Sequence, residues 1–142
     1  MAAIRSGSVW GWFLRNSRAA VKRALATSKF FTSPTSSDER VVLSSNRSGD
    51  WELYSLRASG GELELLLERP GTQHPMAVAL DGSVIFNDYH PVTGLDLWRL
   101  SPSGEATPLV ASPGREWSAS VSPDGRLLAY TSDESGRFEV YL

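Results

Sequence analysis

The sequence contains no cysteine in its 142 residues. Disulfide bonds, thiol nucleophiles and cysteine-based zinc or iron–sulfur sites are therefore excluded. Long hydrophobic runs are also missing, since no apolar stretch approaches the roughly 18 to 20 residues that a transmembrane helix needs. With 41% hydrophobic and 21% charged residues, and with five tryptophans, the composition is typical of one compact globular domain with a real core.

Acidic residues are absent before Asp38, so the charge is divided sharply along the chain. The remaining segment carries all 16 acidic residues against eight basic ones. We therefore divide the chain into a basic leader, residues 1–36, and an acidic body, residues 37–142. The acidic body argues against a nucleic-acid partner, because such binding depends on a basic surface. The leader holds six positive charges, at Arg5, Arg15, Arg18, Lys22, Arg23 and Lys29.

The leader predicts a short amphipathic helix over residues 9–29. One face gathers apolar side chains from Trp10 to Leu25, and the other gathers most of the basic ones. Such a helix could bind a membrane surface, could act as an organelle transit peptide, or could pack on the rim of the body. A disordered leader is the remaining alternative. Membrane contact is expected only through residues 9–29, and the apolar run VWGWFL is too short for a clear secretory signal peptide.

The acidic body contains an internal repeat. The stretch RPGTQHPMAVALDG (69–82) aligns without a gap with SPGREWSASVSPDG (112–125), at an offset of 43 residues. A second register, in which a polar turn precedes an alternating run, repeats with a spacing of 44 and 43 residues. Chance rarely produces two registers with one period. The aromatic residues that mark the second register are Tyr54, Trp98 and Tyr141.

One period predicts four short strands, at residues 83–86, 95–100, 106–111 and 117–122. Four strands in about 43 residues are typical of a propeller blade. The pairs Asp81–Gly82 and Asp124–Gly125 supply the positive-φ glycine that a tight turn between the first two strands requires. We therefore expect an all-β fold, a partial β-propeller of about two and a half four-stranded antiparallel blades.

The stretch SPDGRLLAYTSDESGRFEVYL resembles the PD40, or TolB-like, propeller repeat, which is related in form to WD40 repeats. The matching positions include the Asp124–Gly125 turn, Tyr130 at a strand end and the closing Tyr141. The resemblance covers about three-quarters of the chain and looks most like propellers linked to bacterial Ser/Thr kinases and winged-helix regulators. It implies a bacterial protein of the periplasm or the cytoplasm and does not decide between the two.

A ring of six or seven such blades would need on the order of 260 to 300 residues. The body has 105 residues, so we expect either a fragment or one piece of a self-assembled ring. In both cases the terminal blades would present apolar side chains, and self-association through exposed blade faces is expected.

Catalytic motifs are missing from the sequence. It has only two histidines, His74 and His90, and it lacks a G-x-S-x-G elbow, a Walker loop, an H-E-x-x-H helix and the kinase motifs. The acidic turns lack the dense spacing of a calcium loop. We therefore predict a non-enzymatic chain without a cofactor or a metal.

The strongest hypothesis is a non-catalytic module that binds a protein or a peptide. Its contact residues are expected in the loops before two innermost strands, which border the channel mouth of a propeller: Gln73, His74, Arg115, Glu116 and Trp117. The structural alternative is that His74 and Trp117 only pack against neighbouring blades and cover their edges. The rival function is the gating or sensor domain of a larger enzyme, such as a prolyl-oligopeptidase-type serine peptidase or a bacterial Ser/Thr protein kinase.

Overall fold

A computed structural model describes residues 31–32 and 40–142, and all their regular structure is β-strand. The helix expected at residues 9–29 lies outside the described residues. No helix capable of crossing a bilayer occurs in the described ranges. The strands are β1 (Phe31–Thr32), β2 (Arg40–Ser45), β3 (Glu52–Arg57), β4 (Glu64–Leu67), β5 (Gln73–Val78), β6 (Val84–His90), β7 (Gly94–Leu100), β8 (Ala106–Val110), β9 (Trp117–Val121), β10 (Leu128–Ser132) and β11 (Glu139–Tyr141).

The strands form three separate antiparallel sheets in chain order. Blade 1 is β1-β2-β3-β4, blade 2 is β5-β6-β7-β8, and blade 3 is β9-β10-β11. The prediction of an all-β fold built from four-stranded antiparallel units is confirmed for blades 1 and 2. Strand β1 comes from residues that we assigned to the leader, and it pairs with Val41 and Val42 of β2. The domain boundary at residue 36 stays a prediction.

The sheets are held together by side chains that leave both faces of blade 2. Phe86 and Val84 point toward blade 1, where they meet Leu53. Ile85, which lies between them in β6, points the other way and packs with Ala119 of blade 3. A strand between two neighbours has no face in water, which is why VIF is an uninterrupted apolar run. Burial of each such side chain stabilises the fold by roughly 1.5 to 3 kcal/mol.

The two Asp-Gly turns have the backbone that the repeat predicts. Gly82 and Gly125 have φ values of +86° and +73°, in the left-handed region that favours glycine. In each turn the glycine amide donates to the carbonyl three residues earlier, that of Ala79 at 3.0 Å and that of Ser122 at 2.9 Å. The two Asp-Gly turns therefore have the same backbone conformation in the two copies of the repeat.

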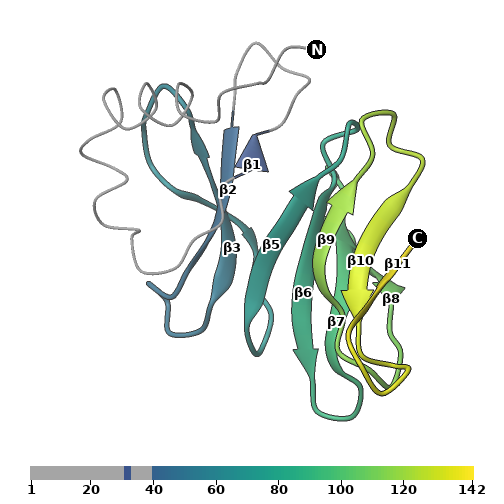
Figure 1. Cartoon of the computed structure of the whole chain (residues 1–142). Coiled ribbons are helices and arrows are strands. Elements are labelled where there is room, and N and C mark those ends of the chain that lie inside the picture. The colour runs from purple at the N-terminus through teal and green to yellow at the C-terminus, as the bar shows by residue number, and fades with distance from the viewer. Residues whose placement is uncertain (1–30, 33–39) are drawn as a thin grey trace.

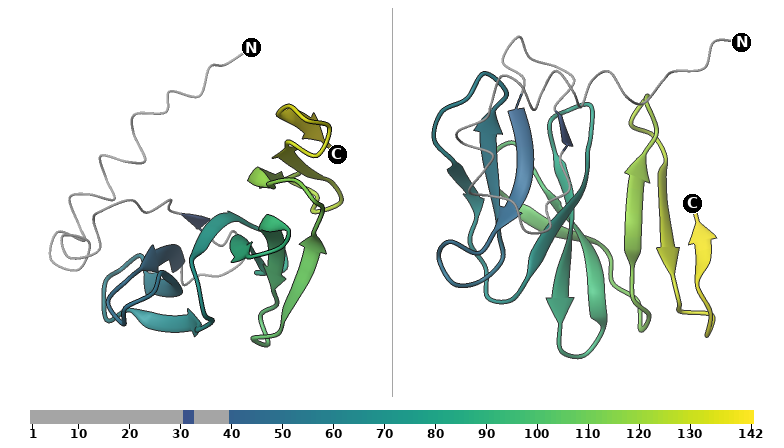
Figure 2. Two further views of the ribbon diagram at one scale, coloured as in Figure 1. Left: turned by 90° about the horizontal axis from the view of Figure 1, so that it is seen from below. Right: turned by 60° about the vertical axis from the view of Figure 1, so that its left-hand side comes forward.

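Seen end-on, the three sheets follow one another along an arc, like sectors of a fan (Figures 1 and 2). The first strands lie together at the narrow edge, where β5 contacts β1 on one side and β9 on the other. The blades therefore share an inner edge, as in a propeller. Blade 3 has an outward face on which Phe138, Val140 and Leu142 are exposed, and within the described chain no further sheet packs against it.

Candidate functional site

Gln73 lies where blade 2 joins blade 1. Its backbone amide donates to the carbonyl of Trp51, just before β3, at 2.7 Å. Its own carbonyl accepts a hydrogen bond from the Ser44 hydroxyl, in β2, at 2.9 Å. The backbone of one residue is thus held at both ends by the preceding blade.

Glu116 is held in the same way where blade 3 joins blade 2. Its amide donates to the Leu95 carbonyl at 2.7 Å, and its carbonyl accepts from the Asn87 side-chain amide at 2.7 Å. Glu116 follows Gln73 by one repeat, as Asn87 follows Ser44. We call this pair of hydrogen bonds, one to the backbone amide and one to the carbonyl of the same residue, the inter-blade grip.

The side chains of the two gripped residues turn back into their own blades. The Gln73 amide group donates to Asp88 at 3.1 Å, and one Glu116 carboxylate oxygen accepts from the Ser132 hydroxyl at 3.1 Å. Both side chains have an exposed fraction of 0%. We expected Gln73 and Glu116 to contact a partner from open loops. Their side chains instead have partners inside the chain, because the grip buries them between blades.

Burial has an electrostatic cost at Glu116. Loss of water around the carboxylate raises its pKa, although hydrogen bonds from Ser112 and Ser132 act in the opposite direction. One of its carboxylate oxygens, Oε2, has no hydrogen-bond partner. The negative charge is therefore incompletely compensated at this junction.

Arg115 and Trp117, which flank Glu116, do meet at the surface. Together with Leu95, Thr131 and Phe138 they line a cleft of about 450 Å3, which we call the Arg115 cleft. It lies at the end of blade 3 where β9 begins and β10 ends. Trp117 has an exposed fraction of 39% and Phe138 one of 59%, so both rings offer apolar surface to a ligand.

The guanidinium in this cleft is held in place by Asp133. Arg115 Nη2 and Nε lie 2.8 and 3.0 Å from one Asp133 oxygen, and the Arg115 amide donates to the other at 2.6 Å. These bonds, the one from the amide first, hold the pKa of Asp133 below its usual range. The Arg115 guanidinium carbon lies 5.5 Å from the centre of the Phe138 ring. The cleft therefore combines apolar walls with a fixed cation.

His74 does not line the Arg115 cleft. It is the second residue of β5, inside the strand rather than before it, and its Nδ1 lies 3.0 Å from the Ser44 hydroxyl oxygen. Its ring centre lies 5.7 Å from that of Trp51. Of the five residues that the sequence suggested, the structure brings Arg115 and Trp117 together in one cleft and leaves His74 at the junction of blades 1 and 2.

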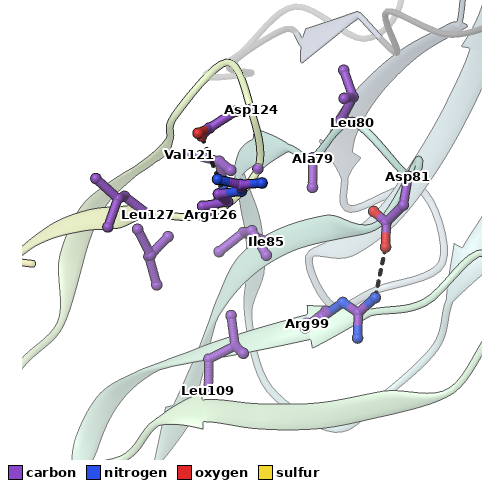
Figure 3. Close-up of a pocket in the computed structure, with 12 residues that line it drawn as sticks. Ala79, Leu80, Asp81, Ile85, Arg99, Leu109, Val121, Asp124, Arg126 and Leu127 are labelled. Atoms are coloured by element: carbon purple, nitrogen blue, oxygen red, sulfur yellow. Dashed lines mark hydrogen bonds and ion pairs between the residues drawn. The ribbon is translucent and has the colours of Figure 1, made fainter.

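A second cleft, which the sequence did not suggest, opens between the two Asp-Gly turns at the opposite end of β9 (Figure 3). This turn cleft has a volume of about 540 Å3 and a mostly aliphatic floor that includes Ile85 and Val121. Leu80 and Leu127 are exposed at its rim. The available signal was the pair of turns at an offset of 43 residues, because neighbouring blades bring equivalent turns side by side.

The charges around the turn cleft are mainly engaged in holding the turns. Arg99 donates to Asp81 at 2.7 Å, and the Ser83 amide, the first cause of the lowered pKa of Asp81, donates to the same carboxylate at 2.9 Å. Asp124 accepts from the Ser122 hydroxyl, which lowers the pKa of Asp124. This arrangement stabilises local geometry, and it offers less open aromatic surface than the Arg115 cleft.

Comparisons with known proteins support the fold. No family model and no curated protein matches the chain. Among solved structures, the chain is similar to a putative TolB from Agrobacterium tumefaciens, with a TM-score of 0.65 and 23% identity over 71% of this chain and 37% of that one. It is also similar to TolB from Acinetobacter baumannii, with a TM-score of 0.61 and 17% identity over 81% of this chain and 31% of that one. The chain spans about a third of the length of these structures, and the likeness shows that its described residues have the fold of β-propeller blades.

Proposed function

We propose that these blades form a non-catalytic recognition module that binds a segment of a protein or peptide in the Arg115 cleft. The observation that carries the proposal is a cleft lined by two partly exposed aromatic residues, Trp117 and Phe138, together with Arg115, whose guanidinium is held by Asp133. Aromatic and arginine side chains in a concave site are the residue types that dominate binding energy at protein interfaces.

The chemistry of the cleft defines the expected ligand. The apolar walls fit an aliphatic or aromatic side chain, and Arg115 favours an acceptor group next to it. Because Asp133 already neutralises much of the Arg115 charge, we expect apolar contact to contribute more than ion pairing. In this proposal the blades act as the recognition part of a longer polypeptide, of the kind linked to bacterial kinases and winged-helix regulators.

A random peptide display library, selected against the full chain, tests the proposal. We expect the selected peptides to share an apolar anchor residue, and the Trp117→Ala variant to bind them at least tenfold more weakly by isothermal titration. A loss of about 1.4 kcal/mol corresponds to that factor, well within the range for truncation of an interface aromatic.

Leu109→Ala is the matched control, because Leu109 has a similar exposed fraction, 42%, and lines the turn cleft instead. Peptide affinity should be unchanged in this variant. Peptides that lose affinity with Leu109→Ala and keep it with Trp117→Ala would place recognition in the turn cleft, and the proposal would be wrong.

A further inference from the structure

The inter-blade grip occurs twice in the chain, at Gln73 and at Glu116. We propose that the Arg115 cleft is the site of a third grip, in which blade 3 binds the leading segment of a further blade of this repeat. By leading segment we mean the extended residues that precede and begin an innermost strand. This inference rests on the proposed function, because both assign partner binding to the Arg115 cleft. The inference adds the identity of the partner.

The first grip shows what such a segment offers. Thr72 forms a parallel bridge with Trp51, and the next residue, Gln73, makes the two backbone hydrogen bonds of the grip. The ring of His74 then lies near the ring of Trp51. The segment is thus bound by a short strand addition, in which backbone bonds supply much of the affinity.

The second grip repeats this plan with other side chains. Leu95 takes the place of Trp51, Asn87 that of Ser44, and Trp117 that of His74. The donor to the carbonyl of the gripped residue can therefore be a hydroxyl or an amide. A ring follows the gripped residue in both copies.

The third copy is present on blade 3. Strand register places Thr131 opposite Val140, as Ser44 lies opposite Leu53 and Asn87 opposite Leu97. Two residues before Val140 comes Phe138, at the position of Trp51 and Leu95. Thr131 and Phe138 both line the Arg115 cleft, so a cavity lies where the two internal grips hold a backbone segment.

The occupant must match three features of this copy. It needs a free backbone amide for the Phe138 carbonyl, a carbonyl for the Thr131 hydroxyl, and an adjacent ring for the exposed face of Phe138. The Thr131 hydroxyl donates to the Trp117 carbonyl at 2.9 Å in the structure, and it must turn to the new carbonyl when the segment binds. The chain's own leading segments satisfy all three requirements.

A synthetic peptide of residues 71–78, GTQHPMAV, acetylated and amidated at its ends, tests the inference. Titrated into the full chain labelled with 15N, it should shift the amide resonances of Thr131, Phe138 and Trp117. The same peptide with Gln73→Pro lacks the required amide hydrogen and should bind at least roughly fivefold more weakly, as expected for one lost hydrogen bond.

A variant of the chain checks the other half of the grip. Thr131→Val should weaken binding of the peptide roughly fivefold, whereas Thr107→Val, on the exposed strand β8, should leave its affinity unchanged. Equal binding of the proline peptide, shifts confined to the turn cleft, or no shifts at all would each overturn the inference. If peptides from the library still bound the Arg115 cleft in those cases, the proposed function would stand and only the identity of the partner would be wrong.

Discussion

Position 73 and position 116 carry different chemistry in one structural role. Both residues are gripped by the preceding blade, but Gln73 is neutral whereas Glu116 can carry a charge. The amide of Gln73 donates to a carboxylate, and the carboxylate of Glu116 accepts from hydroxyls. Because a glutamine side chain fits this site at position 73, a glutamine should also fit the equivalent site at position 116.

Glu116→Gln should therefore stabilise the chain at neutral pH. Burial raises the pKa of Glu116, so the folded state holds its proton more tightly than the unfolded state. The stability that Glu116 contributes is then present at low pH and is lost as the pH rises through its folded pKa. We expect the variant to gain about 1 kcal/mol in free energy of unfolding at pH 7, and less at pH 4.

Urea unfolding of both proteins at the two pH values measures this difference. Asp81, Asp124 and Asp133 have lowered pKa values and give the opposite trend, because their contribution is lost as the pH falls. That trend is common to both proteins and cancels in the comparison. A gain that is equal at pH 4 and pH 7 would show that the charge of Glu116 is not its cause.

Polarity alone misled sequence reasoning at these residues. Gln73 and Glu116 are polar, and each precedes a predicted innermost strand, so an exposed loop was the natural expectation, although Gln73 is in fact the first residue of β5. Their burial depends on Ser44 and Asn87, which lie 29 residues earlier in the chain. A polar residue directly after the apolar run of each second strand, Ser44 or Asn87, was the available signal, but its donor role becomes visible only when neighbouring blades are placed side by side.

At the scale of elements, the pattern predicted strands better than their ends. Residues 95–100, 106–111 and 117–122 correspond closely to β7, β8 and β9. Strand β6 continues four residues beyond the predicted end at Phe86, because its polar half pairs with β7 as far as His90 and Gly94. Apolar runs mark the part of a strand that lies between blades, and the polar part is fixed by hairpin pairing.

The loop before β9 depends on a glycine that allows close approach. A Cβ atom at Gly114 would lie 2.7 Å from the Glu134 amide nitrogen and 2.9 Å from the Ser132 hydroxyl oxygen. Gly114→Ala should therefore push the loop away from the β10–β11 hairpin and cost roughly 1 to 3 kcal/mol of stability. Since Arg115 follows, its bonds to Asp133 should weaken, and the pKa of Asp133 should rise toward its usual value.

Carboxylate NMR titration of Asp133 separates this effect from general destabilisation. Gly71→Ala, one repeat earlier, is the control, because a Cβ atom there meets nothing closer than 3.9 Å but the backbone has a φ of +105°. It should cost roughly 1 to 2 kcal/mol through backbone strain and leave the pKa of Asp133 unchanged. An unchanged Asp133 in Gly114→Ala would mean that the loop adapts without moving Arg115.

At the scale of the whole molecule, repetition explains what could be predicted. The period of 43 residues and the Asp-Gly turns predict blades, and the structure and its TolB-like neighbours agree. The Arg115 cleft could be predicted only in part, because Arg115 and Trp117 are near each other in sequence whereas Phe138 joins them from just before β11. The turn cleft combines residues from two blades, so the repeated Asp-Gly turns indicate it only once neighbouring blades are placed side by side.

The outward face of blade 3 leads to a prediction about association. Val140 has an exposed fraction of 72% and lies on this face with Phe138 and Leu142, so the face offers contiguous apolar surface. Sedimentation velocity should therefore show concentration-dependent association of the chain. Val140→Lys should weaken it at least roughly tenfold, since burial of an unpaired ammonium is costly.

Val92→Lys provides the matched control, because Val92 is exposed at 83% in the turn between β6 and β7, which belongs to blade 2. The added charge is the same in both variants, so a general effect of net charge on solubility would change association equally. Association that weakens only in Val140→Lys assigns the contact to blade 3. Equal weakening, or none in either variant, would show that this face does not mediate contact between copies, although the chain uses the corresponding faces of blades 1 and 2 to hold its own sheets together.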